Sequence, residues 1–137
     1  MHITYSSSTD GLAAKQLSGF FVDWPQRPDP ETHLTILRGS YAVWLAMDGD
    51  QCVGFINALS DGVLCAYVPL LEVLPPYQGR GIGTELVRRM MRRLAGMYAL
   101  DVVCDASLAP FYARLGFAQC TAMVQRNRDH QGTMRML

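Results

Sequence analysis

The chain has 137 residues, half of them hydrophobic, and its formal net charge at pH 7 is zero. This length suits one globular domain with its own core, so residues 1–137 are expected to form a single domain. A zero net charge gives no whole-molecule field that attracts nucleic acid or an anionic membrane. No apolar run approaches the ~18 residues of a membrane helix, and the N-terminus lacks a signal-peptide pattern. We expect a soluble, unprocessed, cytoplasmic protein.

The first forty residues are predicted to contain a short strand and two helices. Ile3 and Tyr5 alternate with polar neighbours and indicate the strand. Asp29-Pro30-Glu31 supplies an N-cap, a proline at the first helical position and an acid in the first turn, so a helix should run to Arg38 and stop at Gly39. An earlier helix, capped by Thr9 or Asp10, would carry four apolar side chains: Leu12, Leu17, Phe20 and Phe21.

Three strands are predicted in the middle of the chain. Residues 41–47 and 52–59 are joined by the turn Asp48-Gly49-Asp50. Residues 63–74 form an almost uninterrupted apolar run, which is typical of a central strand covered on both faces. Pro69 lies inside this run and cannot donate to a ladder, so we expect a bulge or a locally unpaired edge there.

The remaining residues are predicted to alternate helix and strand. Residues 84–97 form a helix with an apolar side opposite four arginines, which are expected to be a solvated face. A strand over 100–104 precedes a short helix from Ser107 to Leu115, which ends at a glycine C-cap. Residues 117–126 are expected to be strand, and 127–137 a partly ordered tail. The four arginines are Arg88, Arg89, Arg92 and Arg93.

The four cysteines stand far apart and form no C-x-x-C pair. This spacing gives neither a zinc site nor a dense disulfide framework, so we expect reduced thiols and no metal. The cysteines are Cys52, Cys65, Cys104 and Cys120.

The most informative motif joins the long apolar run to the helix that follows it. It reads Gln78-Gly79-Arg80-Gly81-Ile82-Gly83. Glycines let the backbone come close to a ligand, and the first N–H groups of a helix bind an anion, so this junction is predicted to hold phosphate. The alternative is a tight turn with no ligand.

Two nucleotide-binding patterns do not fit the motif. A Walker loop needs a lysine, and none follows Gly83. A Rossmann fingerprint needs a glycine at Thr84 and a place on the first βα unit, whereas this motif follows several hairpin-connected strands. The remaining pattern is Gln/Arg-x-x-Gly-x-Gly/Ala after a strand of the form Leu-x-Val-x-Pro, here Leu71-Glu72-Val73-Leu74-Pro75.

With this pattern and the segment Phe111-Tyr112-Ala113-Arg114-Leu115-Gly116-Phe117, the sequence resembles the GNAT superfamily of acetyl-CoA dependent N-acetyltransferases. The resemblance spans at least Val53 to Phe117. It implies an α/β fold with a mixed, mostly antiparallel sheet of six to seven strands, flanked by about four helices. The sheet should splay open between its fourth and fifth strands, with coenzyme A in the gap.

The resemblance also implies how acetyl-CoA is held as a cosubstrate. The Val73 backbone should pair with the pantetheine amides as an added strand would. The Leu71 N–H should point at the thioester carbonyl and polarise it. The pyrophosphate should be held by the backbone of seven residues: Gln78, Gly79, Arg80, Gly81, Ile82, Gly83 and Thr84. An arginine of the following helix could reach the 3′-phosphate of the cofactor or a nucleic acid.

Two side chains are candidates for proton transfer. Tyr112 matches the tyrosine that the family commonly aims at the sulfur as general acid, and the alternative is packing beside Phe111. Glu72 is the only charge between Leu64 and Leu74, so it is either the general base or a partner of an arginine on the next helix. Where some relatives have a catalytic carboxylate, this chain has Tyr67. The other candidates for the base are Asp61, Asp105, His33 and a water chain.

The expected acceptor is a primary amine of a small molecule or peptide. Five aromatic residues could line an apolar pocket for an arylalkylamine or could belong to the core. The alternative function is a non-catalytic acyl-CoA binding or sensing module, and we expect no nucleic acid or membrane partner and a monomer or homodimer. The five residues are Phe20, Phe21, Trp24, Tyr41 and Trp44.

Overall fold

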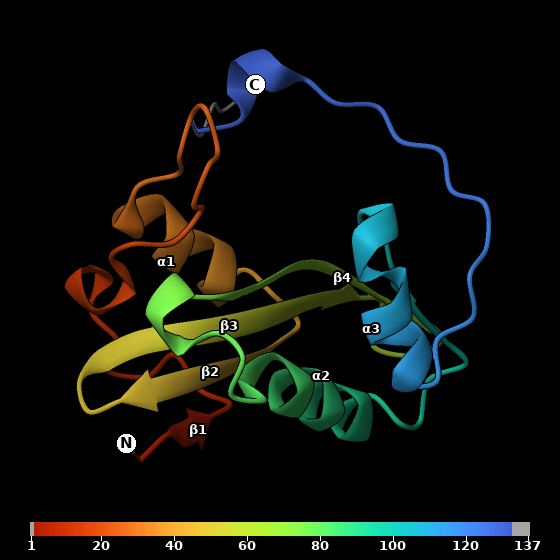
Figure 1. The fold of residues 1–137 in the computed structure, drawn as a ribbon, viewed down its shortest axis with the longest axis horizontal. Helices are drawn as coiled ribbons and strands as arrows, with labels where there is room; N and C mark the ends of the chain where they lie inside the picture. The colour runs from red at the N-terminus through yellow and green to blue at the C-terminus, as the bar shows by residue number, and fades with distance from the viewer. Residues whose placement is uncertain (1, 133–137) are drawn as a thin grey trace.

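A computed structural model describes residues 2–132 and contains one five-stranded sheet (Figure 1). The strand order is β1-β2-β3-β4-β5, and all neighbours are antiparallel except β4 and β5, which are parallel. The strands are β1 (Thr4–Ser6), β2 (Ala42–Asp48), β3 (Gln51–Ser60), β4 (Cys65–Val73) and β5 (Ala99–Val102). The α-helices are α1 (Pro30–Arg38), α2 (Ile82–Arg93) and α3 (Ala109–Arg114).

The prediction of a helix after Thr9 or Asp10 is wrong. Only a 3-10 turn, η1 (Ala14–Leu17), forms in this segment. Gly19 has a φ of 95° and Phe21 a φ of 61°, values that no right-handed helix accommodates. The four apolar side chains chosen from the sequence are nevertheless buried, because the irregular chain packs them against the sheet.

The sequence signals for α1 are confirmed. The Asp29 side chain accepts a hydrogen bond of 2.8 Å from the Thr32 N–H, and Pro30 is the first helical residue. The helix ends at Arg38, and Gly39 is its C-cap. Local residues therefore set both ends of α1, with Asp29 and Pro30 at its start and Gly39 at its end.

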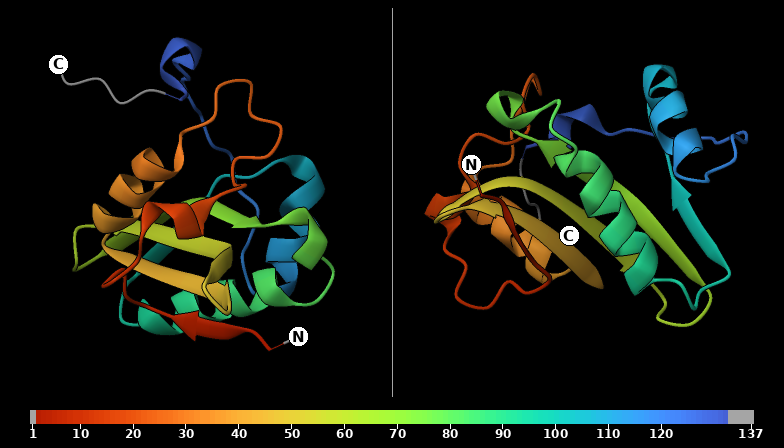
Figure 2. Two further views of the ribbon diagram at one scale, coloured as in Figure 1. Left: turned by 90° about the vertical axis from the view of Figure 1, so that its left-hand side faces the viewer. Right: turned by 60° about the horizontal axis from the view of Figure 1, so that its bottom comes forward.

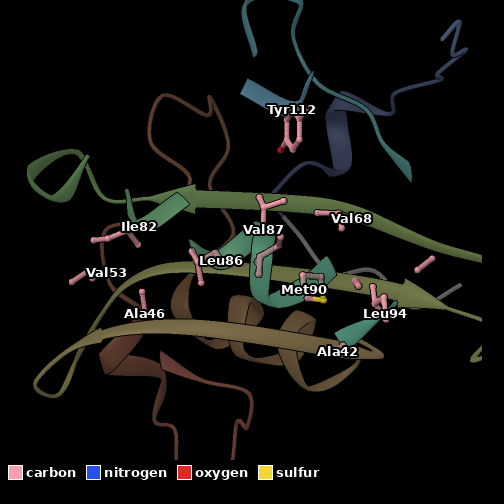
Figure 3. Packing of buried hydrophobic residues seen from close by; sticks show 13 residues of the cluster. Ala42, Ala46, Val53, Val68, Ile82, Leu86, Val87, Met90, Leu94 and Tyr112 are labelled. Carbon is pink, nitrogen blue, oxygen red and sulfur yellow. The ribbon is translucent and has the colours of Figure 1, made fainter. Parts of the chain in front are cut away.

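The sheet has a hydrophobic cluster on each face. The α1 face is covered by α1 and the N-terminal segment, whereas α2 covers the opposite face (Figures 2 and 3). β2 shows the alternation clearly, because Val43 and Leu45 belong to the α1 side and Ala42 and Ala46 to the α2 side. The middle of the sheet is thus buried on both faces, as the apolar runs predict.

The bulge expected at Pro69 is confirmed. Asn57 pairs with Leu70 and Leu59 with Tyr67, so Val68 and Pro69 together oppose Ala58.

Beyond the bulge, β4 no longer pairs with β5. The pairing of β4 with β5 extends only from Cys65↔Ala99 to Val68↔Val102, so the last four residues of β4 pair with β3 alone. The expected separation of the fourth and fifth strands is therefore present.

The C-terminal region differs from the expectation. α3 ends in a Schellman turn, in which the Phe117 N–H donates to Tyr112 O and the Gly116 N–H to Ala113 O, both at 3.1 Å, with Gly116 at a φ of 98°. Residues 117–126 form no strand, because nothing in the described chain pairs with them. The described sheet therefore has five strands, not six or seven, with three α-helices, not four. Residues 133–137 of the expected tail lie outside the described residues.

The arginines of α2 form a largely solvated face, as predicted, because Arg88, Arg92 and Arg93 are exposed and Arg89 is half-buried. Arg89 pairs with Glu85 at 2.8 Å, and its guanidinium lies 4.5 Å from the Tyr5 ring centroid and 5.0 Å from that of Trp44. Arg93 lies 5.4 Å from the Tyr41 ring centroid. Two of the four arginines thus pack on aromatic rings. The other two, Arg88 and Arg92, line a hollow of about 310 Å³ with Arg114 of α3.

Residues 2–132 contain neither a helix that could span a membrane nor a cluster of metal-binding side chains. No helix there has the length and apolarity to cross a membrane. That stretch also contains no cluster of three or more histidines, cysteines and acidic residues able to hold a metal ion. The four cysteines are free thiols.

Candidate active site

A cleft of about 460 Å³ lies where β4 and β5 separate. Its walls come from the end of β4, the turn η2 (Pro75–Tyr77), the start of α2, and η3 (Ala106–Leu108) with α3. Ten of the eleven residues chosen from the sequence line it. These are Leu71, Glu72, Val73, Gln78, Gly79, Gly81, Ile82, Gly83, Thr84 and Tyr112.

The N-terminus of α2 can bind an anion in this cleft. Its N-cap, Gly81, is in the left-handed region with a φ of 83°, and no side chain caps the helix. The first helical hydrogen bond runs from the Glu85 N–H to Gly81 O at 3.0 Å, so three earlier N–H groups have no partner within the helix. They belong to Ile82, Gly83 and Thr84, all of which line the cleft. Together with the helix dipole, these donors favour a phosphate.

A glycine on β3 sets how close this helix start lies to the sheet. A Cβ at Gly54 would come within 3.2 Å of both Ile82 Cγ2 and Leu86 Cδ1. A larger residue at Gly54 would force these two side chains of α2 to shift by a few tenths of an ångström. The close packing of the helix start therefore depends on a glycine 28 positions before Ile82, and no local pattern in the sequence shows this.

The free edge of β4 forms the second wall. The Leu74 N–H donates to Val53 O at 2.8 Å, and antiparallel pairing alternates along a strand. Glu72 therefore bonds β3 through its backbone, whereas the N–H and C=O groups of Leu71 and Val73 face the opening. The Gln78 side chain supports this orientation, because its Nε2 donates to Val73 O at 2.9 Å.

Tyr112 projects from α3 toward β4 across the gap (Figure 3). The side chain is 7% exposed and packs edge-on against the rings of Phe111 and Phe117, with centroids 4.9 and 5.5 Å away. Burial, with a smaller contribution from the nearby Cys104 thiol, raises the pKa of Tyr112 to about 12. The phenol is therefore protonated at neutral pH, and its hydroxyl donates to no other described residue.

Glu72 connects β4 to the N-terminal segment. Its carboxylate accepts hydrogen bonds from the backbone N–H groups of Phe21 at 2.8 Å and Val22 at 3.3 Å. Glu72 makes no ion pair with a described arginine, so the salt bridge to the next helix considered from the sequence is not formed. Among the described residues that line the cleft, Glu72 is the only charged one.

The other candidates for the base do not line the cleft. His33 is 1% exposed and lies between phenylalanine rings, and burial lowers its pKa to about 4. The Asp61 carboxylate accepts hydrogen bonds from the N–H groups of Val63 and Leu64, both at 2.8 Å, and closes a turn. Tyr67 and Asp105 are also absent from the lining.

The aromatic residues considered for an acceptor pocket are not in the cleft either. Phe20 and Phe21 are buried with His33 and Phe55 beneath α1. Trp24 packs against the ring of Phe21, and Tyr41 and Trp44 lie under the arginines of α2. The alternative role, a place in the core, therefore holds for Phe20 and Phe21, whereas Tyr41 is 41% exposed.

Three lining residues were missed by the sequence reasoning: Tyr77, Leu108 and Phe111. Tyr77 adjoins the glycine motif, and its hydroxyl donates to the Asp48 carboxylate, which ties the turn to the β2–β3 hairpin. Phe111 belongs to the second motif, which predicts only its contact with Tyr112. Arg80 is the one selected residue outside the lining, and its guanidinium lies 5.9 Å from the Tyr77 ring centroid.

These features fit the class of proteins that hold a phosphate-bearing cofactor along an open strand edge. A sequence profile described as the acetyltransferase (GNAT) family matches residues 10–117. The chain therefore belongs to the GNAT acetyltransferase family.

Known structures and curated sequences agree with this assignment. A candidate acetyltransferase from Deinococcus radiodurans R1 is 41% identical, with a TM-score of 0.94, over 98% of this chain and 94% of that one. An aminoglycoside N-acetyltransferase in complex with CoA shares the fold at 18% identity, with a TM-score of 0.67, over 92% and 94% of the two chains. Serotonin N-acetyltransferase 2 of Oryza sativa is 32% identical over 81% of this chain and 59% of its own length. The chain spans 33% to 69% of the length of the curated relatives it matches.

Proposed function

We propose that the protein is an acyltransferase that moves the acetyl group of acetyl-CoA to a primary amine of a small molecule or peptide. The observation that carries this proposal is one cleft where three features meet. They are the free edge of β4, the unpaired N–H groups of α2 and the protonated hydroxyl of Tyr112. Each corresponds to a separate requirement of acetyl transfer from a thioester.

Acetyl-CoA fits the donors that line the cleft. The backbone of residues 78–84, with Ile82, Gly83 and Thr84 at the helix start, would hold the pyrophosphate. The Val73 backbone would pair with the pantetheine amides, once the Gln78 side chain releases the Val73 carbonyl. Bound there, the cosubstrate supplies an activated acetyl group. The Leu71 N–H would polarise the acetyl carbonyl.

Proton transfer falls to two residues in this proposal. Tyr112 gives its proton to the sulfur as the bond from carbon to sulfur breaks, and its raised pKa keeps that proton available at neutral pH. Glu72 takes a proton from the attacking nitrogen. Two N–H groups occupy two of the roughly four lone-pair positions of its carboxylate, so capacity to accept a proton remains.

The acceptor is the least constrained part of the proposal. Glu72 marks the end of the cleft next to the N-terminal segment, and an amine approaching there would meet the only charge of the lining. A single carboxylate favours a monoamine over a polycation. The serotonin named for the rice relative belongs to this class, so small arylalkylamines are the first compounds to test.

The direct test measures free thiol released from acetyl-CoA with a panel of amines, together with thermal stability with and without CoA. We expect stabilisation by CoA and thiol release with at least one primary amine. Stabilisation without thiol release across the panel would instead identify a non-catalytic acyl-CoA binding or sensing module. No response to CoA would reject both functions.

We also propose that the protein acts in the cytoplasm without a metal. Three of its four free cysteines, Cys65, Cys104 and Cys120, are exposed, and exposed thiols persist best in a reducing compartment. The measurement is the thiol content of the protein isolated from its cells, which should equal four per chain.

A further inference from the structure

The free edge of β4 is occupied at one point by a side chain of the same molecule. Beyond the bulge, the N–H and C=O groups of Leu71 and Val73 face away from β3. Among residues 2–132, only one of these four groups has a hydrogen-bond partner, because Gln78 Nε2 donates to Val73 O at 2.9 Å. A glutamine side chain ends in a primary amide, so this contact reproduces the bond that an added strand would make to the same carbonyl. Gln78 therefore caps the open edge at Val73.

A stiff turn brings Gln78 back to the strand. The Gln78 N–H donates to Pro75 O at 3.2 Å. Pro75 and Pro76 fix two φ angles within the turn, so the backbone between Val73 and Gln78 has little freedom. Gln78 itself is exposed, so its side chain can leave the Val73 carbonyl without opening the core. The bond to Val73 O is thus formed in advance and readily released.

The same side chain also adjoins the anion site of the cleft. Gln78 lines the cleft, as do the first three residues of α2, whose N–H groups have no partner within the helix. A phosphate bound to those N–H groups would offer oxygen atoms to Gln78 Nε2. Hydrogen bonds to an ionised acceptor are roughly twice as strong as those between neutral groups, so a phosphate would compete with Val73 O for this donor. One amide group therefore has two alternative partners in one cleft.

We infer that Gln78 couples the phosphate and amide halves of the cofactor site, an inference that rests on the proposed function. While the cleft holds no phosphate, Gln78 Nε2 caps Val73 O and keeps other amides from pairing there. When a diphosphate binds at the start of α2, Gln78 Nε2 moves to a phosphate oxygen and leaves Val73 O open to the pantetheine amide. The edge therefore admits an amide-bearing arm that carries its own phosphate, and it discriminates against peptides and other amides that lack one.

The size of this coupling follows from the one hydrogen bond that is exchanged. A neutral hydrogen bond changes an equilibrium constant by a factor of about two to ten. Pantetheine alone must break the bond between Gln78 and Val73, so it should bind more weakly by that factor than to an uncapped edge. ADP carries the diphosphate without the amides, and pantetheine carries the amides without a phosphate. By linkage, each of these two fragments should raise the affinity for the other by the same factor.

The test measures the dissociation constant of pantetheine by nuclear magnetic resonance titration, with and without saturating ADP. In the wild type, ADP should tighten pantetheine binding by about two- to tenfold. Gln78→Met keeps the length of the side chain and removes its donor. Pantetheine should therefore bind this variant equally with and without ADP, and more tightly than it binds the wild type without ADP. Gln26→Met is the matched control and should behave as the wild type, because Gln26 is exposed, lies outside the cleft lining and makes no side-chain hydrogen bond within residues 2–132.

The side-chain amide of Gln78 gives a second readout, which decides the question in the wild type even where a variant does not fold. ADP alone should shift its resonances, because the amide changes partner. Resonances that ADP leaves in place overturn the inference, as does coupling that persists in Gln78→Met. Titration with CoA separates this inference from the proposed function. A wild type that binds CoA but binds the two fragments independently loses only the role of Gln78, whereas one that does not bind CoA rejects both.

Discussion

The carboxylate of Glu72 on β4 accepts a 2.8 Å hydrogen bond from the backbone N–H of Phe21, a residue held at a φ of 61°. A positive φ is costly for a phenylalanine, so the turn needs support from its surroundings. Glu72 supplies that support across 51 positions of sequence. The same carboxylate is the only charge that residues 2–132 contribute to the cleft lining, so the anchoring of the turn and the proposed proton acceptance can be tested separately.

We predict that Glu72→Gln lowers kcat about 10²- to 10⁴-fold, the usual contribution of a general base, with little loss of stability. Glutamine keeps one oxygen to accept the Phe21 N–H. Glu72→Ala removes both acceptors and should also lower the free energy of unfolding by about 2–3 kcal/mol. Urea denaturation and steady-state kinetics on both variants separate the roles. A Glu72→Gln enzyme with normal kcat and a raised KM for the amine would leave Glu72 only as the anchor.

Tyr112→Phe should lower kcat by about 10²- to 10⁴-fold while CoA still binds. The hydroxyl makes no hydrogen bond with another described residue, and the ring contacts with Phe111 and Phe117 are kept, so stability should change little. With a pKa of about 12, the wild-type phenol should cause no loss of activity between pH 7 and pH 10. Titration calorimetry with CoA is the binding control, and undiminished turnover would remove Tyr112 from the role of acid.

Gly83→Ala should weaken CoA binding without weakening the fold. A Cβ there would lie 3.8 Å from Val73 Cγ2 and 3.9 Å from Phe111 Cζ, so it fits but projects between two residues of the cleft lining. Alanine within a helix is favoured over glycine by up to ~1 kcal/mol, so the melting temperature should stay or rise. Gly96→Ala is the matched control, since its Cβ meets nothing within 4 Å. Equal CoA affinity in both variants would contradict this description of the cleft.

The stability of the fold should fall in mild acid because of His33. Its ring centroid lies 4.3 Å from that of Phe55, neither ring nitrogen has a hydrogen-bond partner among the described residues, and burial lowers its pKa to about 4. The unfolded chain binds this proton near pH 6.5, whereas the folded chain does not until about pH 4. The free energy of unfolding should therefore decline from pH 6.5 to pH 4, by about 3 kcal/mol from this group.

His33→Leu tests this linkage, with the same change at the exposed His2 as its control. The first variant should flatten the decline measured by denaturation between pH 7 and pH 4, and the second should not. Parallel curves for the wild type and His33→Leu would mean that other groups dominate the acid response.

Local signals in the sequence predicted much of the fold. The N-cap at Asp29, the bulge at Pro69 and the glycine stop at Gly116 each act within a few residues, and all three are present. The glycine motif and Tyr112 stand 28 or more positions apart, yet the family resemblance brought them to one cleft, where the structure also has them.

The predictions that were wrong concern segments whose conformation depends on residues far away in the sequence. Residues 9–21 have helical periodicity, but tertiary burial of Phe20 and Phe21 and the bond from Glu72 favour an irregular turn. No local sequence pattern predicts the hydrogen bond between the Phe21 N–H and the Glu72 carboxylate. The segment 117–126 has the composition of a strand, but a strand forms only where another backbone accepts its hydrogen bonds, and the described chain offers none.

The bulge at Pro69 also sets which side of the sheet the end of β4 presents. Before it, Ala66 and Val68 face the α2 cluster, and after it Leu71 and Val73 do, so one extra residue has switched the contributing positions from even to odd numbers. Replacing Pro69 with another residue preserves that count, whereas inserting one further residue after it would turn Glu72 toward the α2 core and Leu71 toward α1. At this point in the chain, the number of residues matters more than their identity.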